Sequence, residues 1–294
     1  MKKALLQLHI AVFLAGFTAI LGKLIGLNEV LLVWYRLLIT VLTLGLILYS
    51  RGKLKRIPVK EVIKIFAVGA LVALHWVAFY GSVKYGNVSI GVVCISGAGF
   101  FTAIFDPLIC RKKISLIEII LGAIAIAGIY IIFDFHPQFK LGILFGVISA
   151  ILCSLFPIFN KQLLLRHSPE ILTLYELGGG LLVLSFFIPV YLPFFPASYF
   201  FPTTHDWIWL LIMAWFCTVL TFDLQLNALT KLSPFTSNLA YNLEPVYGII
   251  LAFVIFNENR ALNINFYLGV GLIIIAVALQ MWRVWYARRR VPGT

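Results

Sequence analysis

The 294-residue chain is 62% hydrophobic, only 12% of its residues are charged, and its net charge is +12. Soluble domains carry about 25% charged residues, so this composition excludes an ordinary soluble protein and indicates an all-α polytopic membrane protein. The basic residues lie in short clusters between apolar segments, which is the pattern of membrane orientation signals. We therefore expect a lipid bilayer, and no nucleic acid, as partner.

Hydropathy predicts ten transmembrane helices. Their expected bounds, in chain order, are 4–22, 29–49, 62–83, 87–109, 115–133, 141–163, 170–192, 207–229, 234–256 and 264–285. The basic start and the apolar run that follows it are also features of a signal peptide. No clean cleavage site follows, so we expect the first span to be a retained helix.

The distribution of basic residues predicts the orientation. Of the 23 lysines and arginines, 18 fall in segments on one side of this ten-span chain, four fall on the other side and one, Arg36, lies within a span. Cytoplasmic loops carry the excess of positive charge in membrane proteins. We therefore expect both termini in the cytoplasm.

An internal repeat divides the chain. The segment Tyr80–Tyr85 (YGSVKY) before the fourth span matches Asn227–Leu232 (NALTKL) before the ninth. The expected units are 1–137 and 138–290, and 291–294 is consistent with a cloning remnant. Because five spans is an odd number, the second unit crosses in the opposite sense. Two inverted five-helix repeats are a common architecture of secondary transporters, with the substrate site near the midplane between the halves.

The ninth span carries a carboxylate at membrane depth. It is nearly uncharged from Pro234 to Phe256, which as one helix would cover about 34 Å. Ser233 is the expected N-cap, and the proline after it suits the first helical position. Glu244 lies near the middle of the span, where an ionisable group should face protein or water.

Polar residues of the ninth span share one face. Ser237, Tyr241, Glu244 and Gly248 recur at helical spacing. Pro245 has no N–H to donate to the carbonyl of Tyr241, so that oxygen is free beside the carboxylate and could bind a cation or a proton. The alternative is a helix bend whose carbonyl is satisfied by a neighbouring helix, with Glu244 neutral or paired.

Arg36 is the one basic residue within a span. With Thr40 and Thr43 it forms a polar face at helical spacing. A guanidinium suits the recognition of a substrate carboxylate because its fork geometry matches that group. The alternative is a structural ion pair with Glu176, in the corresponding part of the seventh span, because a buried charge needs a partner.

The remaining candidates for substrate or ion binding are polar and aromatic side chains at membrane depth: Asp223, Asn227, Asn238, Asn242, His75, Trp76 and Tyr80. A single histidine within a span is more often a hydrogen-bonded core residue than a proton relay. Asparagines also join helices in bundles without binding any ligand. The aspartate lies toward the cytoplasmic end and could instead lie in a wet vestibule.

Several segments carry a recognisable pattern: Leu243–Gly248 (LEPVYG), Phe256–Glu258 (FNE), Ala228–Lys231 (ALTK) with Ser237 and, in the first half, Val83–Gly91 (VKYGNVSIG). Together they resemble the EamA-type transporters of the drug/metabolite transporter superfamily. The resemblance covers nearly the whole chain and implies a multi-pass carrier of the inner membrane that works by alternating access, often as an exporter of amino acids or other metabolites. It is nearly silent on the substrate.

The first half departs from the family pattern. Gly97 and Ala98 occupy the places that correspond to Glu244 and Pro245. If this pair carries chemistry, it does so in one half only.

No metal-ligand spacing, nucleophile–base arrangement or phosphate-binding loop occurs in the sequence, and the four cysteines fall in apolar segments. We therefore expect no enzyme, no metal and no cofactor.

The leading hypothesis is a secondary transporter, an exporter of small polar metabolites such as amino acids. Arg36 and the acids Glu176, Asp223 and Glu244 would offer both signs of charge to a zwitterion, and Glu244 would carry any coupling proton. Two alternatives remain: a polyspecific exporter of drugs and toxic compounds, in which the aromatic lining matters more, and a membrane scaffold without transport. A scaffold would not need polar residues at membrane depth in both halves.

Overall fold

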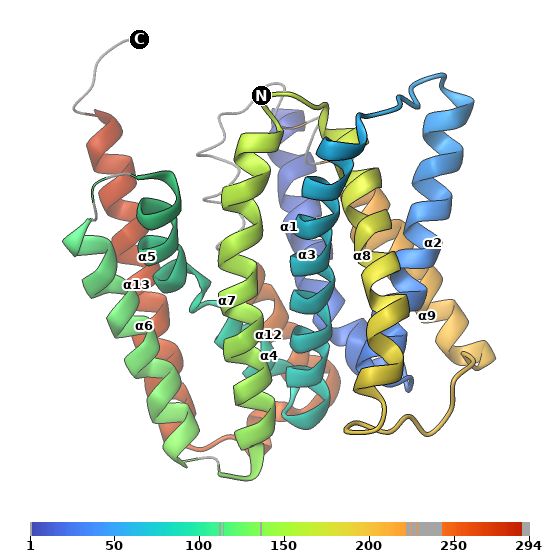
Figure 1. Ribbon diagram of the computed structural model, residues 1–294. Coiled ribbons are helices and arrows are strands. Elements are labelled where there is room, and N and C mark those ends of the chain that lie inside the picture. Colours follow the sequence, from blue (N-terminus) through green and yellow to red (C-terminus); the bar gives the residue numbers. More distant parts are fainter. Residues whose placement is uncertain are drawn as a thin grey trace.

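The structure is a computed structural model that describes the chain except residues 1, 112, 114, 136, 222–223, 225–227, 229–242 and 290–294. The part of the chain that it describes is a bundle of long helices (Figure 1). The helices of the first half are α1 (Lys2–Leu24), α2 (Glu29–Ser50), α3 (Val59–Tyr85), α4 (Val88–Ile95), α5 (Ala98–Cys110) and α6 (Leu116–Phe135). Those of the second half are η1 (Pro137–Phe139), α7 (Lys140–Leu163), α8 (Pro169–Tyr191), α9 (Thr204–Ala214), η2 (Trp215–Leu220), α12 (Glu244–Phe256), η3 (Glu258–Ala261) and α13 (Ile264–Arg289).

The described helices fall in the ten predicted segments. Within the described residues, six helices are long and apolar enough to cross a membrane: α1, α2, α3, α4 and α5 taken together, α7 and α8. Shorter apolar helices lie at Leu116–Ile131, Thr204–Leu220, Val246–Phe256 and Ile264–Ala276. The chain is therefore a polytopic helical membrane protein.

The fourth span differs from the continuous helix expected over 87–109. Helix α4 ends at Ile95, and α5 begins at Ala98. Between them, Ser96 N donates to Val93 O at 3.1 Å and Gly97 N donates to Cys94 O at 3.0 Å, which are the shorter-range bonds of a tightened turn. The break falls at Gly97, the position that corresponds to Glu244 in the second half.

The ninth span also differs from expectation. Helix α12 begins at Glu244 and follows a turn at Leu243, so Glu244 opens a helix instead of lying in the middle of one. Pro245 then occupies the first turn, where its missing N–H costs no helical bond. The expected cap at Ser233 and the freed carbonyl of Tyr241 lie outside the described residues. In both halves a helix thus begins at the corresponding place.

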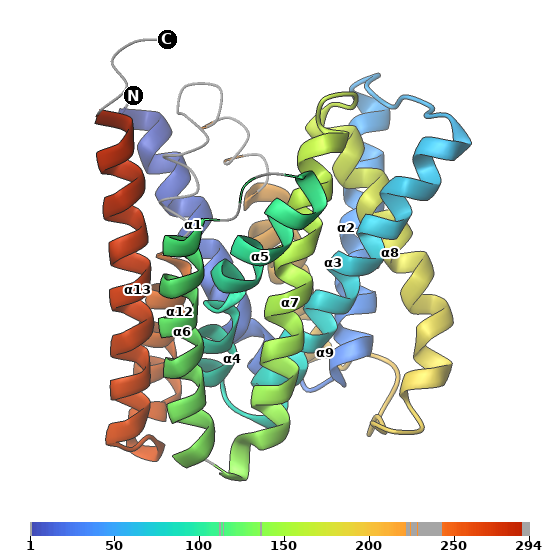
Figure 2. The same cartoon turned by 60° about the vertical axis from the view of Figure 1, so that its left-hand side comes forward.

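The two halves run in opposite directions through the bundle. Helix α1 starts at the end where α7 finishes, and the α6–α7 connection lies at the opposite end (Figures 1 and 2). The start of α1 and the end of α13 lie at the same end, together with the α2–α3, α5–α6 and α7–α8 connections (Figure 2). That end carries most of the basic residues of the sequence, and we call it the basic end; the other is the sparse end.

Helix contacts follow the pseudo-twofold relation of the halves. The helices that correspond between the halves are, in order, α1 and α7, α2 and α8, α3 and α9, α4–α5 and α12, and α6 and α13. The contact of α3 with α7 corresponds to that of α9 with α1. The contact of α4 with α7 corresponds to that of α12 with α1. Likewise α3 packs on α8 as α2 packs on α9. Helices α2, α4 and α6 also pack on their own counterparts, α8, α12 and α13. The halves therefore interleave, and the main hydrophobic core combines side chains from both.

The two halves approach closely at Gly69, where an added Cβ would meet less space than at any other described glycine. A Cβ built on this residue of α3 would lie 1.9 Å from the backbone oxygen of Glu176 on α8, and one on Gly180 would lie 2.7 Å from the oxygen of Gly69. Small residues allow this backbone contact, which is how membrane helices associate closely. Gly178, in the same glycine run of α8, has open space around it.

We predict that Gly69→Ala destabilises the protein by about 1–3 kcal/mol, because the added methyl group meets backbone that cannot rotate away. Thermal unfolding in lipid nanodiscs measures the effect. Gly178→Ala adds the same methyl group in open space, so its midpoint should stay near that of the unmutated chain. Equal midpoints for the two variants would contradict the close α3–α8 contact.

Candidate functional site

Arg36 lies at a meeting point of the two halves. It is on α2 with only 4% of its surface exposed, and it reaches both α3 of the first half and η2 of the second. Its Nε and Nη2 donate to Thr218 Oγ1 at 3.1 and 3.0 Å, and its Nη1 donates to the hydroxyl of Tyr80 at 2.6 Å. The guanidinium carbon lies 3.9 Å from the ring centroid of Trp76. The structure thus brings the predicted residues Arg36, Tyr80 and Trp76 together.

The guanidinium has no carboxylate partner among the described residues. Its hydrogen bonds use three of the five N–H groups of an arginine. The Trp76 ring contributes a cation–π attraction, which is stronger when water is excluded. Neutral partners do not cancel the charge, however, and a buried cation remains costly until an anion approaches. One turn further along α2, the buried hydroxyl of Thr40 has no hydrogen-bond partner among the described residues.

A π-helix aims Thr218 at the guanidinium. In η2 the backbone makes a wider turn, and the hydroxyl of Thr218 also donates to the carbonyl of Met213, five residues earlier. Such turns interrupt α-helices frequently at functional sites. The sequence analysis missed Thr218 because a single threonine in an apolar segment carries no signal of its own.

Glu244 lies at the first position of α12. Its segment packs tightly on α1, since a Cβ on Gly16 would lie 3.1 Å from the backbone oxygen of Glu244. The described contacts of Glu244 are therefore with α1, and no ion pair joins it to Arg36 in the described part of the chain.

Glu176 does not pair with Arg36, so the predicted structural ion pair is wrong. Both oxygens of Glu176 accept from Asn160 Nδ2 of α7, at 3.0 and 3.1 Å. The side chain of Glu176 lies between α7 and α8, because the α3–α8 contact at Gly69 fixes the orientation of α8. Arg36 instead faces α3 and η2.

His75 is a hydrogen-bonded residue of the α3–α7 interface. Its Nδ1 donates to the carbonyl of Ser149 at 3.0 Å, and the Ser149 hydroxyl donates to the carbonyl of His75 at 3.1 Å. Phe79 and Phe156 flank the ring. Of the two roles considered for this histidine, proton relay and hydrogen-bonded core residue, these contacts favour the second.

The other candidates lie outside the described residues: Asp223, Asn227, Asn238, Tyr241 and Asn242. Within the described part, no group of three or more His, Cys, Asp and Glu side chains is arranged to hold a metal ion.

Comparison with known proteins decides the family. The profile of the EamA-like transporter family matches twice, over residues 2–134 and 140–282. The chain belongs to the EamA-like transporter family. The resemblance inferred from the sequence is thereby confirmed, as is the expectation of a transporter family and not an enzyme. The division of this EamA-like chain at residues 137 and 138 stays a prediction.

Two relatives agree with this assignment, and a solved structure bears on the fold. Two uncharacterized transporters of Archaeoglobus fulgidus are 25% identical over 169 residues and 29% identical over 145 residues. The matches cover 58% and 49% of this chain, which spans only 57% and 50% of the length of those relatives. A crystal structure with 14% identity superposes with a TM-score of 0.62, over 94% of this chain and 96% of that one. At that identity it shows the fold alone; the predicted all-helical membrane fold is confirmed, and the two matches of the family profile agree with the predicted repeat.

We predict that Thr218→Val destabilises the EamA-like fold by about 1.5–3 kcal/mol, because two guanidinium N–H groups lose their shared acceptor while the charge stays buried. Thermal unfolding in nanodiscs provides the measurement. Thr221→Val is the matched control, since Thr221 directly follows the same π-helix and its hydroxyl donates to Phe216 O at 2.9 Å, with no contact to Arg36 among the described residues. A Thr218 variant as stable as the control would show that this acceptor matters little.

Proposed function

We propose that the chain is a secondary transporter that carries small polar metabolites with a carboxylate, such as amino acids, by alternating access, and that it works as an exporter. The observation that carries this proposal is the buried Arg36 guanidinium, which has no anionic partner in the described part of the chain. A substrate carboxylate would supply the missing charge and could use the unbonded N–H groups. In this proposal Glu244, at the start of α12, would face the ammonium group of a zwitterion.

We further propose that both termini lie in the cytoplasm of a cell whose inner membrane the protein spans. The support is that the basic end of the bundle holds both the start of α1 and the end of α13 (Figure 2). Loops rich in lysine and arginine stay on the cytoplasmic side.

Arg36→Lys should weaken the binding of carboxylate solutes about tenfold, because an ammonium cannot replace the planar fork that donates two parallel hydrogen bonds. A screen of labelled amino acids in proteoliposomes first finds a transported solute, and competition then gives its affinity for both proteins. The matching amino-acid amide is the control, since it lacks the carboxylate and should lose little affinity. An unaltered affinity for the acid would assign Arg36 to structure.

Glu244→Gln should remove the pH dependence of transport if Glu244 carries a coupling proton, because glutamine has the same shape and cannot titrate. Uptake into proteoliposomes with and without an imposed pH gradient measures this. Glu170→Gln is the control, as Glu170 is an exposed carboxylate that pairs with Lys53. A Glu244→Gln protein that responds to pH as before would exclude Glu244 from the proton route.

A polyspecific exporter is the second candidate. The aromatic rings of Trp76 and Tyr80 beside Arg36 favour it, because such surfaces accept many apolar shapes. Competition among chemically unrelated solutes separates the two functions: mutual inhibition supports the polyspecific exporter, and selectivity for amino acids supports the metabolite carrier.

A further inference from the structure

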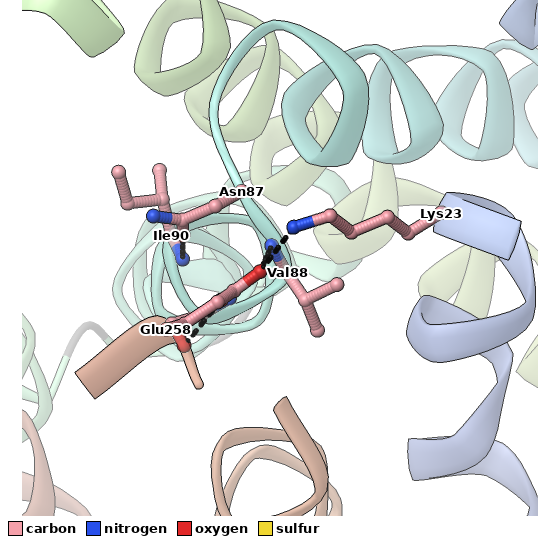
Figure 3. Close-up of polar contacts among 6 residues, drawn as sticks. Lys23, Asn87, Val88, Ile90 and Glu258 are labelled. Atoms are coloured by element: carbon pink, nitrogen blue, oxygen red, sulfur yellow. Dashed lines mark hydrogen bonds and ion pairs between the residues drawn. The ribbon is translucent and has the colours of Figure 1, made fainter. Parts of the chain in front are cut away.

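Glu258 joins three segments at the sparse end of the bundle. Its Oε1 accepts from the backbone N of Val88 at 3.1 Å and from Lys23 Nζ at 2.8 Å. Its Oε2 accepts from the backbone N of Ser89 at 2.9 Å and from the Ser89 hydroxyl at 2.8 Å. Figure 3 shows the carboxylate between the end of α1 and the start of α4. Only 5% of Glu258 is exposed.

These contacts cross the boundary between the halves. Glu258 begins η3 in the second half, whereas Lys23 lies in the last turn of α1 and Ser89 in the first turn of α4, both in the first half. The Lys23 ammonium also lies 4.5 Å from the ring centroid of Phe256, the last residue of α12. One carboxylate thus holds α1, α4 and the end of α12 together.

The carboxylate acts as a cap supplied from another part of the chain. The first N–H groups of a helix have no partner within it, and the helix dipole favours negative charge there. Glu258 takes the N–H groups of Val88 and Ser89, and Asn87 takes that of Ile90 at 2.8 Å (Figure 3). Because hydrogen bonds to an ionised acceptor are about twice as strong as neutral ones, the bonds of Glu258 dominate this cap.

A second set of cross-half contacts reinforces the sparse end. Asp206 of α9 accepts from the backbone N of Gly26 at 2.8 Å, and Glu29 of α2 accepts from the hydroxyl of Tyr191 at 2.6 Å. Tyr199 also donates to Asp206 at 2.8 Å; burial and this neighbouring carboxylate raise the pKa of Tyr199 to about 12, so the hydroxyl keeps its proton. The described contacts therefore join the two halves at this end through several hydrogen bonds besides those of Glu258.

The described ion pairs of the basic end differ in exposure: both side chains are partly buried in Arg283–Glu118 and in His167–Glu61, whereas other pairs are open to water. Glu61 on α3 pairs with Arg166 at 3.7 Å, and the arginine side chain is 70% exposed. Exposed pairs of this kind contribute little, because water screens them. The Glu258 carboxylate is buried together with the N–H groups of Val88 and Ser89, so water weakens these bonds less than it weakens the Glu61–Arg166 pair.

We propose that Glu258 is the latch of the sparse end: its carboxylate, with Lys23 as counter-ion, keeps α4 docked on the second half, and this contact must break before a solute can pass at that end. The inference rests on the alternating access proposed above, in which the two ends open in turn. Glu258 is a positioning residue, since it sets the balance of conformations without touching the solute.

A thiol at position 92 reports opening. Val92 of α4 is 3% exposed and packs against Gly248 of α12, so it lies behind the latch at the contact between the halves. The experiment places Val92→Cys in the full chain, in nanodiscs, and measures the rate of labelling by a water-soluble maleimide without any solute. Tandem mass spectrometry separates labelling of the introduced thiol from that of the four native cysteines.

Glu258→Gln should increase the rate at which the introduced thiol is labelled about tenfold, because an amide is a weaker acceptor for two helix N–H groups and an ammonium. Lys23→Met keeps the cap and removes only a partly exposed ion pair, so about a twofold increase is expected. Glu61→Gln, the same change at the basic end, should leave the rate unaltered. Equal rates for Glu258→Gln, Glu61→Gln and the parent would overturn the latch.

Ser89→Ala is a second variant, for use if Glu258→Gln does not fold. It removes one hydrogen-bond donor to Oε2 of Glu258, so it should also increase the labelling rate. An unchanged rate in Ser89→Ala would overturn the latch.

The double exchange Lys23→Glu with Glu258→Lys separates the cap from the ion pair. A lysine at 258 cannot accept from the N–H groups of Val88 and Ser89, so the exchange should label as fast as Glu258→Gln. Labelling at the parent rate would overturn the cap. Because labelling needs no solute, a labelling response in a protein that transports nothing would support the latch and contradict only the transport function.

Discussion

Lipid cannot solvate a charge, so a charged side chain inside a membrane needs polar partners from the protein. This requirement governs the centre of the bundle. Arg36 satisfies it incompletely: a threonine hydroxyl, a phenol and an indole ring surround the guanidinium, but no described carboxylate neutralises it. The surrounding elements, α2, α3 and the π-helix η2, come from both halves, so the cation lies where the halves meet. A site of this kind is stable enough to fold and still favours the arrival of an anion.

The same constraint shapes the ends of the interrupted helices. A helix that begins within the bundle leaves N–H groups that lipid cannot satisfy. At α4 the structure satisfies them with Asn87 from the preceding turn and Glu258 from the other half. The contacts of Arg36 and the cap that Glu258 supplies to α4 thus follow from one requirement. Polar groups inside the membrane need partners within the protein, and here those partners come from both halves.

The sequence was sufficient to predict the spans and the repeat. Each span is a run of apolar residues, and the lysines and arginines fall mostly in the connections at one end of the bundle. It did not predict the break between α4 and α5, since Ser96 and Gly97 bring no charge or proline that a hydropathy window would register. The partners of Arg36 and Glu176 depend on how the helices are rotated about their axes. Contacts between distant segments, such as the one at Gly69, influence that rotation, and the residues next to Arg36 and Glu176 in the sequence do not reveal it. Glu258 stood in a segment that resembled the family, yet its role needed two other segments far away in the chain.

Interleaving also has a consequence for how the protein is made. Helix α3 leaves the ribosome well before α7 and α8, against which most of its buried face packs. Until they arrive, the groove at Gly69 and the hydrogen-bonding groups of His75 face lipid or another protein. The five spans of the first half therefore form an incomplete intermediate during insertion, and the bundle is complete only when α7 and α8 pack against α3.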